Sequence, residues 1–173
     1  MVTEAERPLI PTWLRTALIG RRPRRTLVRI LIFAPLVFLV AKFALLPIRV
    51  QGGSMLPTYK ENGINCVNRL AYFRSKPKRG DVVAIRFAGP HVMLMKRIIG
   101  LPGETVAFHR GRVLIDGQPL IEPYVRWGCD WETEPVTLGP EEYFFVGDNR
   151  SMPQMDHTFG RGARERIVGK ILL

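Results

Sequence analysis

The sequence contains few of the residues from which metal centres and disulfide frameworks are built. Its 173 residues include two cysteines and three histidines, and the scattered histidines match no metal-ligand spacing. We therefore predict neither a metal nor any other cofactor. Cys66 falls in a predicted strand and Cys129 in a distant predicted loop, so we do not expect these two cysteines to form a disulfide.

Acidic residues are also scarce, with 15 aspartates and glutamates against 26 lysines and arginines and a net charge of +11. Such an excess can indicate a protein that binds nucleic acid, but its distribution does not favour that class. Residues 1–29 hold seven arginines against two glutamates, next to the longest apolar run, and the remaining excess is spread out without an aromatic-rich basic stripe. The charge is better explained as a signal of membrane topology, and we expect no nucleic-acid partner.

The longest apolar run covers residues 27–48 and reads LVRILIFAPLVFLVAKFALLPI. A helix of this length measures about 33 Å, which is enough to cross the hydrocarbon core of a bilayer, about 30 Å thick. Arg29 and Lys42 lie near its ends, where long side chains reach the membrane interface, and Pro35 is tolerated in a membrane helix. We predict a transmembrane anchor at 27–48, preceded by a basic cytoplasmic segment at 1–26.

Two other interpretations of this run compete with a retained anchor. A cleaved signal peptide also combines a basic segment with an apolar run, but no small-x-small cleavage site precedes Pro47. A core helix of a soluble domain is the least favoured, because the run is long. By the positive-inside rule, the arginines at 21–25 stay in the cytoplasm, and the chain after Pro47 lies on the extracytoplasmic face of the cytoplasmic membrane.

Beyond the anchor, the pattern changes to short β-rich runs separated by turn signals. The predicted strands cover residues 64–68, 81–87, 92–99, 105–109, 112–115 and 142–146. Arg110-Gly111 and Asp116-Gly117 are typical of hairpin turns, and residues 122–140 have no clear period and are predicted to form a long loop. This pattern predicts a mostly β extracytoplasmic domain at 49–173, of the sandwich or barrel type.

Two features of this domain suggest nucleophilic chemistry. Gly52-Gly53-Ser54 forms a turn in which a foreign backbone can approach a serine hydroxyl, although such a sequence is more often only a turn. Lys96 lies inside the apolar run Val92–Ile99, where burial would favour its neutral form, although a strand lysine can also point into solvent. A neutral amine beside a hydroxyl is a general base beside a nucleophile.

Four segments together resemble type I signal peptidases, in the order found in that family and after a membrane anchor. They are Gly53-Ser54-Met55-x-Pro57-Thr58, Arg79-Gly80-Asp81-Val82-Val83, Lys96 to Glu104 (KRIIGLPGE) and Gly147-Asp148-Asn149-Arg150. Gly160 and Ile167-Val168-Gly169-Lys170 add to the likeness, which covers most of residues 48–173. The bacterial single-protein kind is most similar, because it also has a lysine at the position of Lys96. The resemblance implies a fold of coiled antiparallel sheets after one N-terminal transmembrane helix.

The resemblance also implies a mechanism and a substrate. Ser54 would attack the scissile carbonyl of an exported preprotein to form an acyl-enzyme, and Lys96 would accept the proton and later activate water. The backbone N–H of Ser54 would be one oxyanion donor. Gly52 stands where many members carry a second donor, a serine, and Pro153 stands where many carry a serine that orients the lysine. Ser151 is a possible substitute for that serine.

Further residues are assigned to supporting and binding roles. We expect Arg97 and Asp148 to form an ion pair that holds two of the segments together, and Gly53, Pro57 and Arg150 to support the site structurally. The substrates implied by the resemblance carry small residues at the first and third positions before the cleaved bond. They would bind in shallow apolar pockets lined near Met55, Leu56, Leu94 and Met95, with the chain extended along the 94–96 edge.

Other functions stay open at this point. His157, which follows Asp156, is the one credible rival to Lys96 as the base that activates Ser54. A related Ser-Lys peptidase, such as a conjugation-pilin maturation enzyme or a self-cleaving repressor, would share the dyad. A non-catalytic, membrane-anchored β-domain that binds exported chains is the third class, suggested by the changes at Gly52 and Pro153.

Overall fold

A computed structural model describes residues 23–88 and 92–172. The chain divides into two compact units, of which the first contains the helix α2 and the second is Ala44–Leu173. Most of the predicted basic segment lies outside the described residues, as do residues 89–91 between two of the predicted strands. Within the described ranges, α2 is long and apolar enough to cross a membrane.

The helix α2 covers Pro23–Ala44, whereas the sequence predicts 27–48. It begins at a proline, which is tolerated in the first helical turn, and it contains Pro35. The predicted end is wrong by four residues because Leu45–Arg49 form strand β1, in which Pro47 pairs with Cys66. Proline breaks a helix interior but is accepted on an edge strand, where its missing N–H costs no ladder bond.

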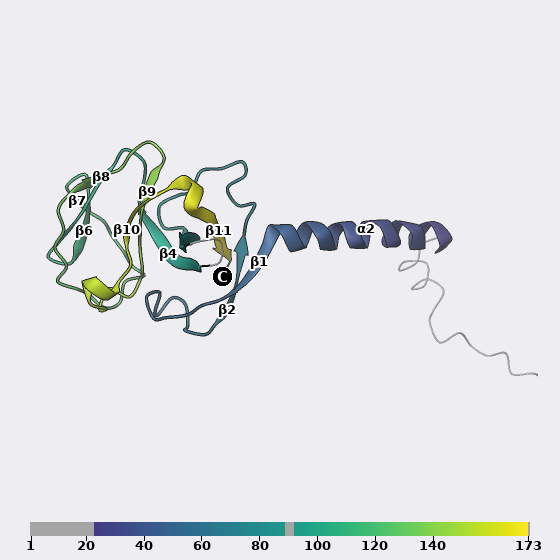
Figure 1. The fold of residues 1–173 in the computed structure, drawn as a ribbon, viewed down its shortest axis with the longest axis horizontal. Coiled ribbons are helices and arrows are strands. Elements are labelled where there is room, and N and C mark those ends of the chain that lie inside the picture. The colour runs from purple at the N-terminus through teal and green to yellow at the C-terminus, as the bar shows by residue number, and fades with distance from the viewer. Residues whose placement is uncertain (1–22, 89–91, 173) are drawn as a thin grey trace, which may run out of the picture. The chain divides into compact units, whose positions relative to one another are not determined.

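The larger of two antiparallel sheets has seven strands in the order β1-β2-β11-β3-β4-β9-β10 (Figure 1). Its strands after β1 are β2 (Ile64–Asn68), β3 (Val82–Ala88), β4 (Val92–Gly100), β9 (Glu142–Val146), β10 (Gly160–Ala163) and β11 (Ile167–Leu172). The C-terminal strand β11 is inserted between β2 and β3. This pairing brings the last residues of the chain into the centre of the sheet.

The smaller sheet has four strands in the order β7-β6-β5-β8. They are β5 (Thr105–His109), β6 (Arg112–Ile115), β7 (Gln118–Pro119) and β8 (Val136–Thr137). The two predicted hairpin turns are present, and all four of their residues have positive φ, from 48° at Arg110 to 79° at Gly117. Positive φ at both central residues defines the turn type that matches the twist of a hairpin.

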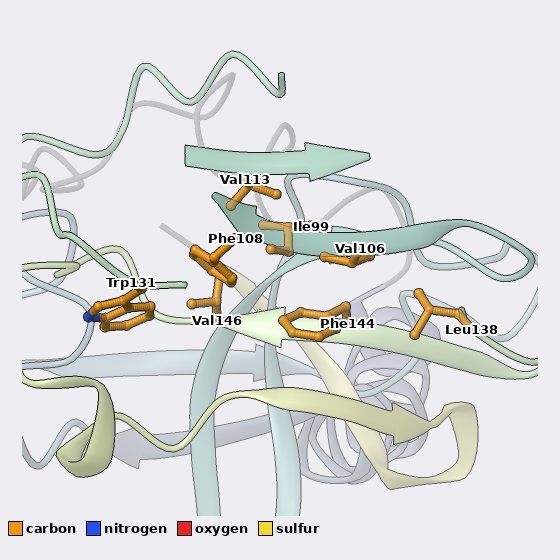
Figure 2. Close-up of a cluster of buried hydrophobic side chains, with 8 residues drawn as sticks. All are labelled: Ile99, Val106, Phe108, Val113, Trp131, Leu138, Phe144 and Val146. Carbon is orange, nitrogen blue, oxygen red and sulfur yellow. The ribbon is translucent and has the colours of Figure 1, made fainter. Parts of the chain in front are cut away.

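The largest apolar cluster contains residues of both sheets (Figure 2). Ile99 comes from β4, Phe108 from β5 and Phe144 from β9, while Trp131 comes from the segment between β7 and β8. The Phe108 and Trp131 rings lie 5.3 Å apart, within the range of favourable aromatic pairs. Two further clusters are centred on β3, one of them including Met55 and Tyr59 and the other Ile98 and Phe145.

The predicted mostly β fold is confirmed, as are the six predicted strands to within one residue at each end. Five strands were not predicted: β1, β7, β8, β10 and β11. The segment 122–140 contains β8, so it is not wholly a loop. Two short 3-10 helices, η1 (Gln154–Asp156) and η2 (Arg164–Arg166), flank β10.

Candidate active site

Ser54 lies in a turn between β1 and β2, and two of the residues that follow it are buried. Met55 is 1% exposed and Tyr59 4% exposed, and both pack in the cluster that includes Val82 and Ala84 of β3. The N–H of Tyr59 donates a hydrogen bond to the carbonyl of Met55 over 3.0 Å. Ser54 itself is half-buried, so the apolar residues after it hold it at the edge of the core.

The turn is bound to the segment that follows β9. The backbone N–H of Asn149 donates to the Ser54 carbonyl, and its side-chain amide donates to the Gly53 carbonyl, each over 3.0 Å. Thr58 Oγ1 donates to Oδ2 of Asp148 over 2.6 Å. These three bonds join two of the four segments that the sequence singled out.

Lys96 lies in β4, in register with Val83 of β3, and is only 3% exposed. None of the ion pairs within residues 23–88 and 92–172 involves it. Burial lowers the pKa of its amine from the usual 10.5 to about 8, because removal from water disfavours the charged form. A substantial share of the amine is therefore neutral just above neutral pH, as a general base requires.

Gly147 is the point at which the serine turn and the lysine strand meet. Arg97 pairs with Val146 in the β4–β9 ladder, so Lys96 and Gly147 occupy the next positions along the two strands. A Cβ placed on Gly147 would lie 2.2 Å from the Ser54 carbonyl oxygen and 2.7 Å from Nε2 of His157. Only a residue without a side chain lets these segments approach so closely.

A groove of about 410 Å³ opens beside Ser54. It is lined by the end of β1 and the residues after it, by Ser54 and Met55, by Ala84 of β3 and by Met93, Leu94 and Met95 of β4. Met55, Leu94 and Met95 are thus brought together next to Ser54. Leu56 is not part of this lining; its Cδ1 lies 3.3 Å from the position of a Cβ on Gly53.

The expected ion pair between Arg97 and Asp148 is present and buried. Asp148 is fully buried and accepts from Nε of Arg97 over 2.8 Å and from Nη2 over 2.6 Å. The guanidinium of Arg97 also donates to the Gly80 carbonyl over 2.7 Å and lies 3.9 Å from the centroid of the Tyr124 ring. The pair therefore connects β4, the segment after β9 and the Arg79-Gly80-Asp81 turn.

Arg150 is 1% exposed and forms an ion pair with Glu122. Its Nε donates to the Gly147 carbonyl over 2.9 Å, so it stiffens the segment around Gly147. Sequence reasoning did not identify Glu122, Tyr124 or Thr58 as partners. The signal for Glu122 was weak, since it lies in a stretch without periodicity.

Other candidate chemistry is limited in the part of the chain that the structure describes. It contains no group of three or more His, Cys, Asp or Glu side chains suited to hold a metal ion. Cys66 and Cys129 are free thiols. His157 is 2% exposed, and no hydrogen bond within the described ranges joins its ring to a carboxylate, so the arrangement of a Ser-His-Asp triad is not formed there.

A family model described as "Signal peptidase, peptidase S26" matches residues 24–173. The chain belongs to the signal peptidase family. A Signal peptidase I of Leptolyngbya laminosa is 36% identical over 132 residues, covering 72% of this chain and 65% of that protein. Signal peptidase I T of Bacillus subtilis (strain 168) is 34% identical over 152 residues, covering 81% of this chain and 78% of that protein.

Among solved structures, a signal peptidase I from Enterococcus faecalis V583 is similar, with 27% identity and a TM-score of 0.45. The match covers 57% of this chain and 98% of that one. This chain spans 65% of the length of the Leptolyngbya relative and 58% of a Probable signal peptidase I-2 from Synechocystis. Membership of the signal peptidase family, together with the apolar helix α2, fits a membrane-anchored protein.

Proposed function

We propose that this chain is a membrane-anchored serine endopeptidase that removes N-terminal signal peptides from exported preproteins. The observation that carries the proposal is at Gly147: the Ser54 turn approaches it closely and is hydrogen-bonded to Asn149, and the buried Lys96, whose pKa is lowered, occupies the facing position on β4. The predicted organisation goes with it: a cytoplasmic segment before the helix, a single-pass anchor in the cytoplasmic membrane, and a catalytic domain on the extracytoplasmic face. The partners are signal peptides and membrane lipid.

The reaction proceeds in two proton-coupled steps. Lys96 accepts the proton of the Ser54 hydroxyl as Ser54 Oγ bonds to the scissile carbonyl carbon, and the proton then passes to the departing amine. The neutral Lys96 next takes a proton from a water molecule whose oxygen bonds to the acyl carbon, and it gives that proton to Ser54 Oγ as the ester bond breaks and the new carboxyl terminus leaves. The N–H of Ser54 donates no hydrogen bond within the described ranges, so it is available to the oxyanion.

The groove suits an extended peptide. Strand β4 pairs with β9 only from Arg97 onward, so the backbone of Met93 to Lys96 has a strand partner only on the β3 side. The groove is also lined by residues 48–52, which end β1 and lead to Ser54. A signal peptide in this groove would form backbone hydrogen bonds regardless of its sequence, while its small side chains enter the groove beside Met55 and Met95.

The test is cleavage of a preprotein by the purified full chain in detergent, with the products identified by mass spectrometry. We expect one cut, after alanine in an alanine-x-alanine site. A leucine in place of the last alanine should lower kcat/KM by about 100-fold or more, since the shallow groove must otherwise deform; leucine at the middle position is the matched control. Binding without cleavage would instead support the non-catalytic β-domain, and indifference to the leucine would support a different processing peptidase.

The rate is expected to depend on pH through Lys96. Because the base acts only when neutral and its pKa is about 8, kcat/KM should fall roughly tenfold per pH unit below 8 and level off above it. A pH–rate profile with a substrate that lacks titrating groups near the cleavage site measures this limb. If kcat/KM instead rose with a midpoint near pH 4, the base would be a group other than Lys96.

The lowered pKa of Lys96 also predicts how the free energy of unfolding depends on pH. The amine titrates at about 8 in the folded chain and at 10.5 when free, so the unfolded chain binds more protons between these values and stability rises with pH across that interval. Over the whole interval the free energy of unfolding rises by about 3 kcal/mol. Lys96→Met should lack it and should be more stable than the wild type at pH 7. Equal pH dependence of the two chains in denaturant unfolding would contradict the assignment.

Gly147→Ala is expected to lower kcat by about 100-fold, because the new Cβ would lie 2.2 Å from a backbone oxygen of Ser54 and must displace the nucleophile. Gly128→Ala is the matched control, since a Cβ there meets nothing within 4 Å. Thermal unfolding separates misplacement of Ser54 from loss of the fold. Wild-type kcat in Gly147→Ala would show that the close approach is not required.

A further inference from the structure

His157 is a buried histidine whose ring nitrogens form no hydrogen bond of normal geometry among the described residues. It follows η1, is 2% exposed, and packs edge-on against Trp131 with the ring centroids 4.9 Å apart. Neither Nδ1 nor Nε2 forms a hydrogen bond of normal geometry in the described part of the chain, although the backbone of His157 itself and that of Asn149 lie close enough to raise its pKa. Burying such atoms without partners costs folding free energy, so a site that keeps them calls for an explanation.

The ring lies where the two proposed catalytic segments meet. Its Nε2 would be 2.7 Å from a Cβ on Gly147, and the Ser54 carbonyl oxygen lies 2.2 Å from the same point. Lys96 is on the neighbouring strand, at the position next to the Arg97–Val146 pair. The imidazole is therefore beside both the serine turn and the lysine strand.

The electrostatic surroundings keep the imidazole neutral. Burial, followed by the positive charges of Lys96 and Arg150, lowers the pKa of His157 to about 4. The other groups packed on the ring, Trp131 and Phe159, are uncharged. A neutral imidazole has one nitrogen that accepts a hydrogen bond, and the nearby amine that lacks an acceptor is that of Lys96.

The hydroxyl that the sequence suggested for orienting the lysine has another partner. Ser151 Oγ donates to Oδ1 of Asn149 over 2.7 Å, and position 153 is a proline without a donor or acceptor side chain. The nearby carboxylates are engaged too, Asp148 with Arg97 and Glu122 with Arg150. His157 is thus the side chain near Lys96 that still has an open acceptor.

We propose that His157 is a positioning residue: its ring forms no hydrogen bond of normal geometry in the described residues, and a turn of the Lys96 side chain would let the amine donate a hydrogen bond to the neutral imidazole and so direct its lone pair toward the Ser54 hydroxyl. The inference rests on the proposed function. One N–H of the amine is held by the ring, and the lone pair is left to take the serine proton. No proton is transferred to His157 at any step.

Two substitutions separate this role from packing. His157→Phe keeps an aromatic ring against Trp131 but removes both nitrogens, whereas His157→Gln loses the ring and keeps an acceptor oxygen. We expect kcat of the phenylalanine variant to fall about 100-fold with KM unchanged, and that of the glutamine variant to stay within about tenfold of the wild type. The matched control is His109→Phe, because His109 is exposed and pairs with Glu132. A phenylalanine variant as active as the glutamine variant, or a wild-type kcat in both, would overturn the inference.

A second measurement does not depend on activity. In the full chain carrying Ser54→Ala, the ¹³C shift of Lys96 Cε is followed with pH by nuclear magnetic resonance. An acceptor stabilises the ammonium more than the amine, so adding His157→Phe should lower the pKa of Lys96 measurably, and adding His109→Phe should not. If the pKa of Lys96 is unchanged by His157→Phe, the proposed hydrogen bond does not exist and the inference is overturned. A lowered pKa in the Ser54→Ala chain, found together with no preprotein cleavage by the chain that keeps Ser54, would keep the contact and refute the proposed function alone.

Discussion

Ser54→Ala, Lys96→Ala and the double variant are each expected to lose roughly 10⁴- to 10⁶-fold in kcat, and all three by the same factor. A nucleophile and its base act as one unit, so once either is absent the other has nothing left to contribute. Single-turnover cleavage of an alanine-x-alanine preprotein measures the loss. Binding of the preprotein should persist, because the groove walls at residues 48–52 and 93–95 are unchanged.

The controls for this experiment are Ser75→Ala and Lys60→Ala, which alter exposed residues of the same types outside the groove and should keep wild-type rates. Two results would contradict the dyad. Losses that multiply in the double variant would mean that the two side chains act in separate steps. Wild-type cleavage by Ser54→Ala would assign the nucleophile elsewhere.

The strands that the sequence predicts well are those whose ends carry local signals. Strands β5 and β6 are joined by Arg110-Gly111, and Asp116-Gly117 follows the end of β6; positive φ at these four positions is a local property. Strand β11 is held by distant partners instead: it pairs with β2, about a hundred residues earlier in the chain, and with β3. Such pairing leaves little trace in the pattern of the strand itself.

In the candidate site, too, features set by neighbouring residues in the sequence could be predicted, whereas those set by distant contacts could not. The burial of Lys96 could be predicted, because the apolar residues of its own strand surround it. The groove beside Ser54 could be predicted in part, since Met55 adjoins the serine in sequence, whereas Leu56 fails to line it because the turn directs it toward Gly53. The approach of His157 to Gly147 could not, because it depends on how the His157 ring packs against Trp131, which is distant in sequence.

Asp148→Ala is expected to lower the free energy of unfolding by about 3–5 kcal/mol, because it leaves the Arg97 guanidinium buried without its counter-charge. Asp148 accepts two hydrogen bonds from Arg97 and one from Thr58. After its removal, the protein contacts of the guanidinium are the Gly80 carbonyl and the face of the Tyr124 ring. Neither carries a full negative charge.

Chemical denaturation of the full chain in detergent measures this loss, and Lys170→Ala is the matched control. Lys170 pairs with Asp81 over 2.6 Å, but its side chain is 45% exposed, and a solvent-exposed pair contributes at most about 1 kcal/mol. Asp81 also keeps hydrogen bonds from Tyr72 and from the N–H of Lys78. A loss in Asp148→Ala no larger than in Lys170→Ala would show that water reaches Arg97, and that the ion pair is not what holds the Gly147–Arg150 segment against the serine turn.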